Sequence, residues 1–259
     1  MTHHTGKSNI RQIKKLVAVI SDIVNSGVEV ALVTSGAIGV GVGKLGLRDR
    51  PTNTAGKQAA ATIGQCELMF MYDKMFAEFG HTVGQFLITK RDVDNDECRE
   101  NLINAFEKTF EYGAIPIINE NDAVAVEEIV FGDNDSLSAI VAKLIKADAL
   151  LILTDIDGLY TDDPHKNPLA KLIPEVPVLD EKIGRMAKGA VTKVGTGGME
   201  TKIAAANIVT DAGADMVIVN SNNLNNVNKV VAGEEIGTLF LAHKRPDLIQ
   251  EIFNRAPIF

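Results

Sequence analysis

Short runs of nearly uninterrupted apolar residues, separated by longer segments of helical periodicity, most constrain how this chain can fold. Strands of this kind are typical of a parallel sheet covered by helices on both faces, because a strand with one solvated face would alternate apolar and polar residues. We therefore predict an α/β fold, a three-layer α/β/α sandwich with a mainly parallel central sheet. The apolar runs span residues 28–33, 82–88, 114–118, 149–153 and 216–219.

The segments between these runs carry apolar residues at the spacing of amphipathic helices. The first such segment places Ile13, Leu16, Val17 and Ile20 on one face and stops at Gly27, a residue common just beyond helix C-termini. Residues 124–131 are expected to form an antiparallel excursion. Further helices are predicted for residues 54–79, 96–112, 137–145 and 199–212.

Composition excludes several classes of protein. The 259 residues are 46% hydrophobic and 23% charged, with a net charge of −8, which is ordinary for a soluble domain and argues against nucleic acid or an anionic membrane as partner. No apolar run reaches the roughly 18 residues of a membrane span. Cys66 and Cys98 lack the spacing of a metal site or redox pair, so we expect a reduced, cytoplasmic setting. We interpret residues 1–259 as a single domain, with 241–259 as a C-terminal tail.

Polar clusters follow the apolar runs at the point where each strand is expected to end. In open α/β sheets ligands bind beyond the carboxyl ends of the strands, so clusters that share this location predict one site. The clusters are Thr34-Ser35-Gly36, Asn119-Glu120-Asn121-Asp122, Thr154-Asp155 and Asn220-Ser221.

The sequence Gly132-Asp133-Asn134-Asp135 lies directly ahead of the helix predicted for 137–145. Helix N-termini expose unpaired N–H groups and favour anionic neighbours, so the acidic residues can be helix caps. The same position suits a site for a cation or a substrate ammonium. Both interpretations remain open at this point.

Three glycines in four positions mark residues 195–202, which read G-T-G-G-M-E-T-K ahead of a predicted helix. Glycines allow backbone N–H groups to approach a phosphate, and the helix dipole favours its charge. Lys202 could reach back to phosphate oxygens. The segment lacks the G-x-x-x-x-G-K-[ST] spacing of a Walker loop, and a flexible connector is the alternative interpretation.

These segments together resemble the glutamate 5-kinases of the amino-acid kinase family, in the same order along nearly the whole chain. The segments that carry the resemblance are T-S-G-A-I-G-V-G (34–41), I-N-E-N-D-A-V-A (118–125), V-F-G-D-N-D-S-L-S-A (130–139), L-T-D-I-D-G-L-Y-T-D-D-P (153–164) and G-T-G-G-M-E-T-K (195–202).

The resemblance implies a role for each matching residue. Lys202 would face the transferring phosphate, and Asp135 would orient the catalytic lysines. Ser35, Asp122 and Asn134 would bind glutamate. Nucleotide binding would fall to Thr154, Asp155, Thr196, Gly197, Gly198, Met199, Glu200, Thr201 and Lys202.

The implied reaction is attack of the glutamate γ-carboxylate on the γ-phosphate of ATP, with Mg²⁺ bridging phosphates and no metal held by protein side chains. A carboxylate nucleophile needs no general base, and phosphoryl transfer depends mainly on alignment and charge neutralisation. The resemblance also implies a homo-oligomer, either dimer or tetramer, and a downstream glutamyl-phosphate reductase.

Gln65 and the group Lys90-Arg91-Asp92 are interpreted as structural or surface residues.

The chain departs from the family pattern at both ends. The family opens with a strand carrying Lys-x-Gly-Ser/Thr, which this sequence does not show near its start, and many members append an RNA-binding-like PUA domain that is not expected here. There are two interpretations: either the start of this sequence is placed too late, or the protein has lost the strand. Because Lys202 would then be the only lysine that neutralises the transition state, we expect the activity of this chain to be severely impaired. Alternatives to a glutamate kinase are a catalytically impaired ligand-binding homologue and another carboxylate or nucleotide kinase of the same fold.

Overall fold

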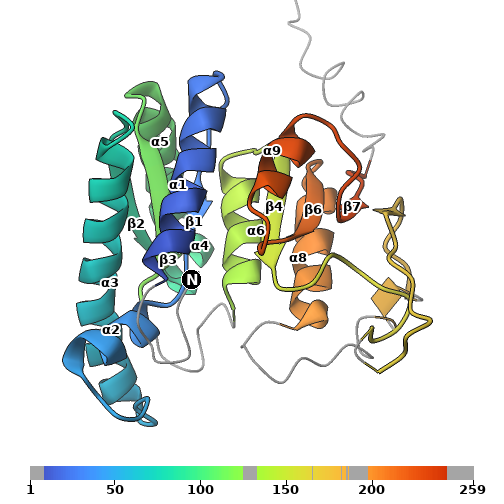
Figure 1. Ribbon diagram of the computed structural model, residues 1–259. Helices are drawn as coiled ribbons and strands as arrows, with labels where there is room; N and C mark the ends of the chain where they lie inside the picture. The colour runs from blue at the N-terminus through green and yellow to red at the C-terminus, as the bar shows by residue number, and fades with distance from the viewer. Residues whose placement is uncertain are drawn as a thin grey trace, which may run out of the picture. The chain divides into compact units, whose positions relative to one another are not determined.

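The computed structural model describes residues 9–124, 133–164, 166–181, 183–184, 186 and 198–243 (Figure 1). The chain divides into two compact units. The first unit comprises Met1–Ser138 and Asn222–Glu234, and the second comprises Ala139–Ser221 and Glu235–Phe259.

The first unit is built on a three-stranded parallel sheet in the order β1-β3-β2. Leu32 pairs with Ile117, and Ile88 pairs with Glu120, so the carboxyl ends of all three strands meet at one edge. Its elements are α1 (Ile10–Asn25), β1 (Leu32–Val33), α2 (Ala37–Leu45), α3 (Thr54–Ala77), β2 (Val83–Ile88), α4 (Lys90–Asp94), α5 (Asp96–Glu111), β3 (Ile115–Glu120) and α9 (Asn225–Val231), and it includes the start of α6 (Asn134–Leu144).

The second unit has a four-stranded sheet in the order β4-β6-β7-β5. The pairs β4–β6 and β5–β7 are parallel, and β6–β7 is antiparallel. Helix α8 supplies Ile203, Ala206 and Val209 to a core that also contains Met216 and Ile218 of β6. The elements are β4 (Ala149–Thr154), β5 (Glu175–Val176), α8 (Met199–Asp211), β6 (Asp215–Asn220) and β7 (Thr238–Phe240), together with the rest of α6.

The predicted α/β class with mainly parallel strands is confirmed, and the described strands form two sheets, one in each unit. The run 28–33 differs from its prediction: pairing with β3 begins only at Leu32, and Val28 is 44% exposed. The sequence did not lead us to predict α2, α4, α9, β5 or β7. The excursion expected at 124–131 falls almost entirely outside the described residues.

Helices α2 and α3 approach each other with almost no side chain between their backbones. A Cβ atom at Gly64 would lie 1.8 Å from the carbonyl oxygen of Ala37, and one at Gly41 would lie 1.8 Å from that of Ala60. Only glycine fits such a contact. This packing fixes the start of α2, and with it the Ser35-Gly36 turn, against α3.

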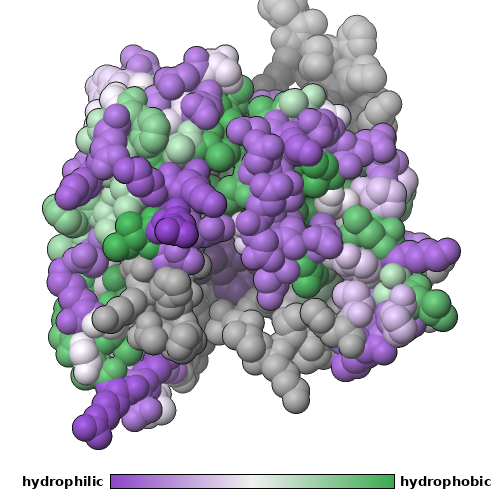
Figure 2. All heavy atoms as spheres, in the orientation of Figure 1, coloured by the Kyte–Doolittle hydropathy of each residue, from purple (hydrophilic) through white to green (hydrophobic). Residues whose placement is uncertain are grey.

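Aromatic and aliphatic side chains fill the core of the first unit. Phe106 of α5 stacks on Phe86 of β2 with ring centroids 4.1 Å apart, and Tyr72 and Phe76 of α3 are fully buried. The face drawn in Figure 2 is mostly hydrophilic, with small scattered apolar areas, as is normal for a protein surface. Among the described residues, no helix combines the length and apolarity needed to cross a membrane.

Candidate functional site

The strand ends of the first unit are joined by Asn134, a residue predicted to bind substrate. Its Nδ2 donates one hydrogen bond to the backbone oxygen of Thr34, after β1, and another to Oδ1 of Asn119 in β3, at 3.1 Å. Thr34 N in turn donates to Ile118 O at 2.8 Å. Residues about 100 positions apart in sequence therefore meet at the carboxyl edge of this sheet.

The helix-cap interpretation of the Gly-Asp-Asn-Asp segment is confirmed for one residue, and its role as a ligand site remains a prediction. Asp133 accepts a hydrogen bond from Ser136 N at 2.7 Å and so caps the first turn of α6. Asn134, the next residue, instead reaches the strand ends. Asp135 lies in the first turn of α6, partly buried, and its backbone oxygen accepts from Ser138 Oγ at 2.7 Å. That Asp135 orients catalytic lysines remains a prediction.

Asp122 lies two residues after β3 and is half-buried. Burial raises the pKa of its carboxyl group above the ordinary value, and the positive charge of Arg50 partly opposes this. Asn121 N donates to Ile88 O at 3.1 Å, which joins this segment to the end of β2. A carboxylate that is poorly hydrated gains most from a cationic ligand.

Ser35 is exposed in the turn that leads into α2. The following residue, Gly36, adopts φ 96° and carries no side chain that could cap the helix. The first N–H groups of α2 therefore lie beside the Ser35 hydroxyl without a side-chain acceptor from Gly36. Such an arrangement favours a carboxylate or phosphate oxygen.

In the second unit, Thr154 and Asp155 end β4 beside the end of β6. Ser221 N donates to Thr154 O at 2.7 Å, and Thr154 Oγ1 donates to Asp155 Oδ1 at 3.2 Å. Asn220 Nδ2 donates to Asp157 Oδ1 at 2.8 Å, and Tyr160 donates to the other oxygen of that carboxylate at 3.1 Å. Asp157, which we did not single out in the sequence, thus fixes the loop after β4.

Thr238 of β7 also contacts the loop that follows β4. Its hydroxyl, fully buried, donates to Ile173 O at 2.6 Å and accepts from Leu159 N at 2.8 Å. A Cβ atom at Gly158 would lie 2.4 Å from this hydroxyl oxygen, so only glycine permits the contact. The Thr154–Leu159 loop is therefore held at both of its sides.

Helix α8 begins at Met199 with Gly198 as its N-cap and no side-chain cap. Thr201 Oγ1 donates to Gly198 O at 2.8 Å, and Glu200 is exposed in the first turn. Lys202 also lies in the first turn but is only 7% exposed, so its stem packs against the unit. Thr196 and Gly197, predicted to bind nucleotide, lie outside the described residues.

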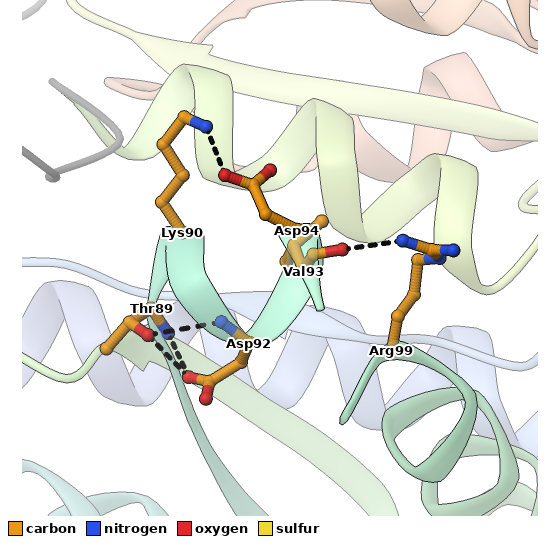
Figure 3. Close-up of polar contacts among 6 residues, drawn as sticks. All are labelled: Thr89, Lys90, Asp92, Val93, Asp94 and Arg99. Carbon is orange, nitrogen blue, oxygen red and sulfur yellow. Dashed lines mark hydrogen bonds and ion pairs between the residues drawn. The ribbon is translucent and has the colours of Figure 1, made fainter. Parts of the chain in front are cut away.

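The group Lys90-Arg91-Asp92 forms the short helix that follows β2 (Figure 3). Thr89 and Asp92 make a reciprocal capping box, in which Thr89 N donates to Asp92 Oδ2 at 2.7 Å. Lys90 pairs with Asp94, and Arg99 donates to Val93 O at 3.0 Å. These contacts support the structural interpretation of this group.

Gln65, which we interpreted as a structural or surface residue, is structural: it is buried and contacts the end of β3. Gln65 is 8% exposed, and its Oε1 accepts a hydrogen bond from Asn119 Nδ2 at 2.9 Å. One signal was available: Gln65 and Tyr72 lie seven residues apart, two helical turns, on the apolar face that includes Ala61 and Leu68. Polar groups on such a face need buried partners.

Among the described residues, no group of three or more His, Cys, Asp or Glu side chains is arranged to hold a metal ion. These residues therefore do not fit a metal site built by the protein alone.

Comparisons with known proteins agree with the resemblance seen in the sequence. The amino acid kinase family matches residues 3–220. The chain is 48% identical to a glutamate 5-kinase of Clostridium perfringens over 248 residues, covering 94% of this chain and 92% of that protein. It is 47% identical to a glutamate 5-kinase of Listeria monocytogenes, covering 94% and 90% of the two chains.

Solved structures share the fold at low sequence identity. A carbamate kinase from Giardia lamblia bound to AMP-PNP gives a TM-score of 0.62 at 15% identity, covering 90% of each chain. An isopentenyl phosphate kinase from T. acidophilum gives a TM-score of 0.59 at 20% identity, covering 91% of this chain and 92% of that one. These likenesses show the fold alone.

Proposed function

The chain belongs to the amino acid kinase family, and we propose that it is a glutamate 5-kinase, which transfers the γ-phosphate of ATP to the γ-carboxylate of L-glutamate. One observation supports the choice of substrate: the amide of Asn134 bridges the ends of β1 and β3, and the half-buried carboxyl group of Asp122 follows β3 by two residues. An acidic amino acid carries an ammonium group, which a carboxylate such as Asp122 can bind, and carboxylate groups, which hydrogen-bond donors can bind.

The substrate ammonium pairs with Asp122 in this proposal. Its three N–H groups also suit the Oδ1 atom of Asn134, since the Nδ2 hydrogens of that residue are engaged by Thr34 and Asn119. A substrate carboxylate accepts hydrogen bonds from the Ser35 hydroxyl and from the first N–H groups of α2.

The nucleotide binds to the second unit in this proposal. The start of α8, whose N-cap is a glycine, offers backbone N–H groups to phosphate oxygens, together with Thr196, Gly197 and Glu200 of the predicted loop. Thr154 and Asp155 contact the nucleoside from a loop that Asp157 and Thr238 hold in place. A magnesium ion bound together with the nucleotide would supply further neutralisation of phosphate charge.

Catalysis in this scheme needs alignment more than covalent chemistry. The γ-carboxylate attacks phosphorus as the bond to the β-phosphate oxygen breaks, and ADP leaves. Lys202 neutralises charge that develops on the transferring phosphoryl group, and Asp135 orients lysine side chains. No proton has to be removed from the nucleophile, because a carboxylate is already ionised at neutral pH.

Broader features of the family are proposed on the same basis. We propose that the two units make up one kinase domain, which works in the cytoplasm as a homo-oligomer. The product is an acyl phosphate, which is labile in water, and a glutamyl-phosphate reductase would consume it.

Trapping of the acyl phosphate tests this function. The full chain is incubated with ATP and Mg²⁺, and ADP release is measured with L-glutamate, L-aspartate, carbamate or UMP as acceptor; for L-glutamate and L-aspartate, hydroxylamine is added and the hydroxamate of the acyl phosphate is measured as well. We expect product with L-glutamate and little with the others. Preferred turnover of carbamate or UMP would contradict the proposal, as would a failure of glutamate to bind in calorimetry.

A further inference from the structure

A continuous chain of amide groups, buried at Gln65 and Asn119 and half-buried at Asn134, links helix α3 to the proposed substrate site. Gln65 Oε1 accepts from Asn119 Nδ2 at 2.9 Å, and Asn119 Oδ1 accepts from Asn134 Nδ2 at 3.1 Å. Gln65 and Asn119 are 8% and 3% exposed, so water does not compete for the hydrogen bond between them. The chain runs across α3, β3 and α6.

The direction of this chain is the same at both of its ends: Thr34 O can only accept a hydrogen bond, and Gln65 presents its oxygen. Because Gln65 offers its oxygen, Asn119 must turn its nitrogen toward α3 and its oxygen toward Asn134. Asn134 then donates both Nδ2 hydrogens, one to Asn119 and one to Thr34 O. Its Oδ1 atom is left to accept a hydrogen bond from a ligand.

Helix α3 contacts the end of β1 as well as the end of β3, each through a hydrogen bond made by a buried side chain. Two turns after Gln65, the buried Tyr72 hydroxyl hydrogen-bonds to Thr34 Oγ1 at 3.0 Å. The backbone oxygen of Thr34 is the other acceptor for Asn134. Both partners of Asn134 are thus held in place by one face of α3.

We infer that Gln65 is a positioning residue: acting through Asn119, it turns the oxygen of Asn134 toward the ammonium group of the substrate. The inference rests on the proposed function for the identity of that ligand. Gln65 does not touch the ligand in this scheme. Within the part of the chain that the structure describes, its buried Nε2 has no hydrogen-bond partner, so the oxygen makes the one hydrogen bond of this amide seen there.

The test separates positioning from a merely structural role. Gln65→Met keeps the shape but removes the acceptor, and we expect the KM for glutamate to rise roughly tenfold while kcat and the KM for ATP stay within about twofold. Gln65→Glu restores an acceptor toward Asn119 and should recover most of the affinity. Gln12→Met is the matched control, since this residue of α1 takes no part in the amide chain, and it should leave both constants unchanged.

Two kinetic results would overturn the inference. One is an unchanged KM for glutamate in Gln65→Met; the other is a Gln65→Glu variant no better than Gln65→Met. Circular dichroism of each variant checks that a raised KM does not come from loss of folded protein.

A second measurement tests the inference even if the proposed function fails. Side-chain amide signals of ¹⁵N-asparagine-labelled, unliganded full chain are assigned by Asn119→Asp and Asn134→Asp. Gln65→Met should shift the signals of both Asn119 and Asn134, and Gln12→Met should shift neither. Unmoved Asn134 signals in Gln65→Met would contradict the amide chain whatever the activity; absence of glutamate-dependent turnover in the unsubstituted chain would contradict only the proposed function.

Discussion

The two units organise their strand ends by different means. In the first unit, side-chain amides bond to one another, from Gln65 through Asn119 to Asn134. In the second unit, Thr238 holds a loop through two backbone groups and a glycine contact, and Asp157 holds it through the side chains of Asn220 and Tyr160. Amides with fixed polarity discriminate between donors and acceptors on a small ligand, whereas backbone N–H groups suit the repeated oxygens of phosphates. The difference agrees with an amino-acid site in one unit and a nucleotide site in the other.

Removal of Lys202 should have the largest effect and should leave the first unit intact. We expect Lys202→Met to lower kcat by about 10²- to 10³-fold, the usual cost of losing one contact to developing charge. The KM for glutamate should stay within about threefold. Steady-state kinetics with both substrates measures this. Lys229→Met, an exposed residue of α9 paired with Glu234, is the control, and an equal loss there would contradict the assignment.

Replacement of Asp122 should weaken the binding of glutamate, the ligand proposed for the first unit, and should leave ATP binding unchanged. Asp122→Asn removes the charge with little change of shape, and loss of a charged hydrogen bond should raise the KM for glutamate roughly 10- to 100-fold. The KM for ATP should not change. Glutamate titrations in calorimetry provide the measurement, and affinity equal to that of the unsubstituted chain would rule out Asp122 as the ammonium partner.

The same substitution predicts a pH dependence of stability. Burial raises the pKa of Asp122 in the folded chain above its unfolded value, so the folded state holds the proton more tightly. Stability from this group is therefore present below the unfolded pKa of about 3.9 and is lost as pH rises through the folded pKa. Without ligand, Asp122→Asn should melt at a higher temperature than the unsubstituted chain at pH 7, with the gain shrinking on acidification. A constant difference across pH would contradict this account.

A methyl group at Gly158 should disturb the second unit alone. The added Cβ would lie 2.4 Å from Thr238 Oγ1, and overpacking of this kind costs about 1–3 kcal/mol. We expect Gly158→Ala to lower the melting temperature and weaken ATP binding, with glutamate binding retained. Gly184→Ala is the matched control, because a Cβ there meets nothing within 4 Å. Equal melting temperatures for the two variants would contradict a stabilising role for the contact at Thr238.

The smallest effect is expected at the cap of α4 (Figure 3). Thr89→Ala removes the hydroxyl of the capping box, which should cost about 1 kcal/mol of stability. Neither KM should change, since the cap supports only the turn after β2. Chemical denaturation measures the stability, and a raised KM for glutamate would show that α4 contributes to the site.

The fold class and most helices were predictable, because apolar periodicity is local. The strand at 28–33 was predicted too long, since pairing with β3, a tertiary contact, decides where β1 begins. Short elements such as α4 and β7 carry too few residues for a periodic pattern.

The site was predictable where a motif ends a strand. Asp122 was predicted in this way, whereas Asn134 was predicted from a motif ahead of a helix; the roles of both came from the resemblance and remain predictions. The contact of Gln65 with Asn119 was not predicted, because a single polar residue on a helix does not reveal which distant amide it meets. Asp157 was hidden similarly, since its partner Asn220 lies 63 residues away.

Dissociation constants for glutamate and for AMP-PNP, measured by calorimetry on Asp122→Asn and Gly158→Ala, test the division of labour most directly. The account predicts that Asp122→Asn weakens only glutamate binding and that Gly158→Ala weakens only AMP-PNP binding. Equal weakening of both ligands by either variant, or the reverse pattern, would contradict it.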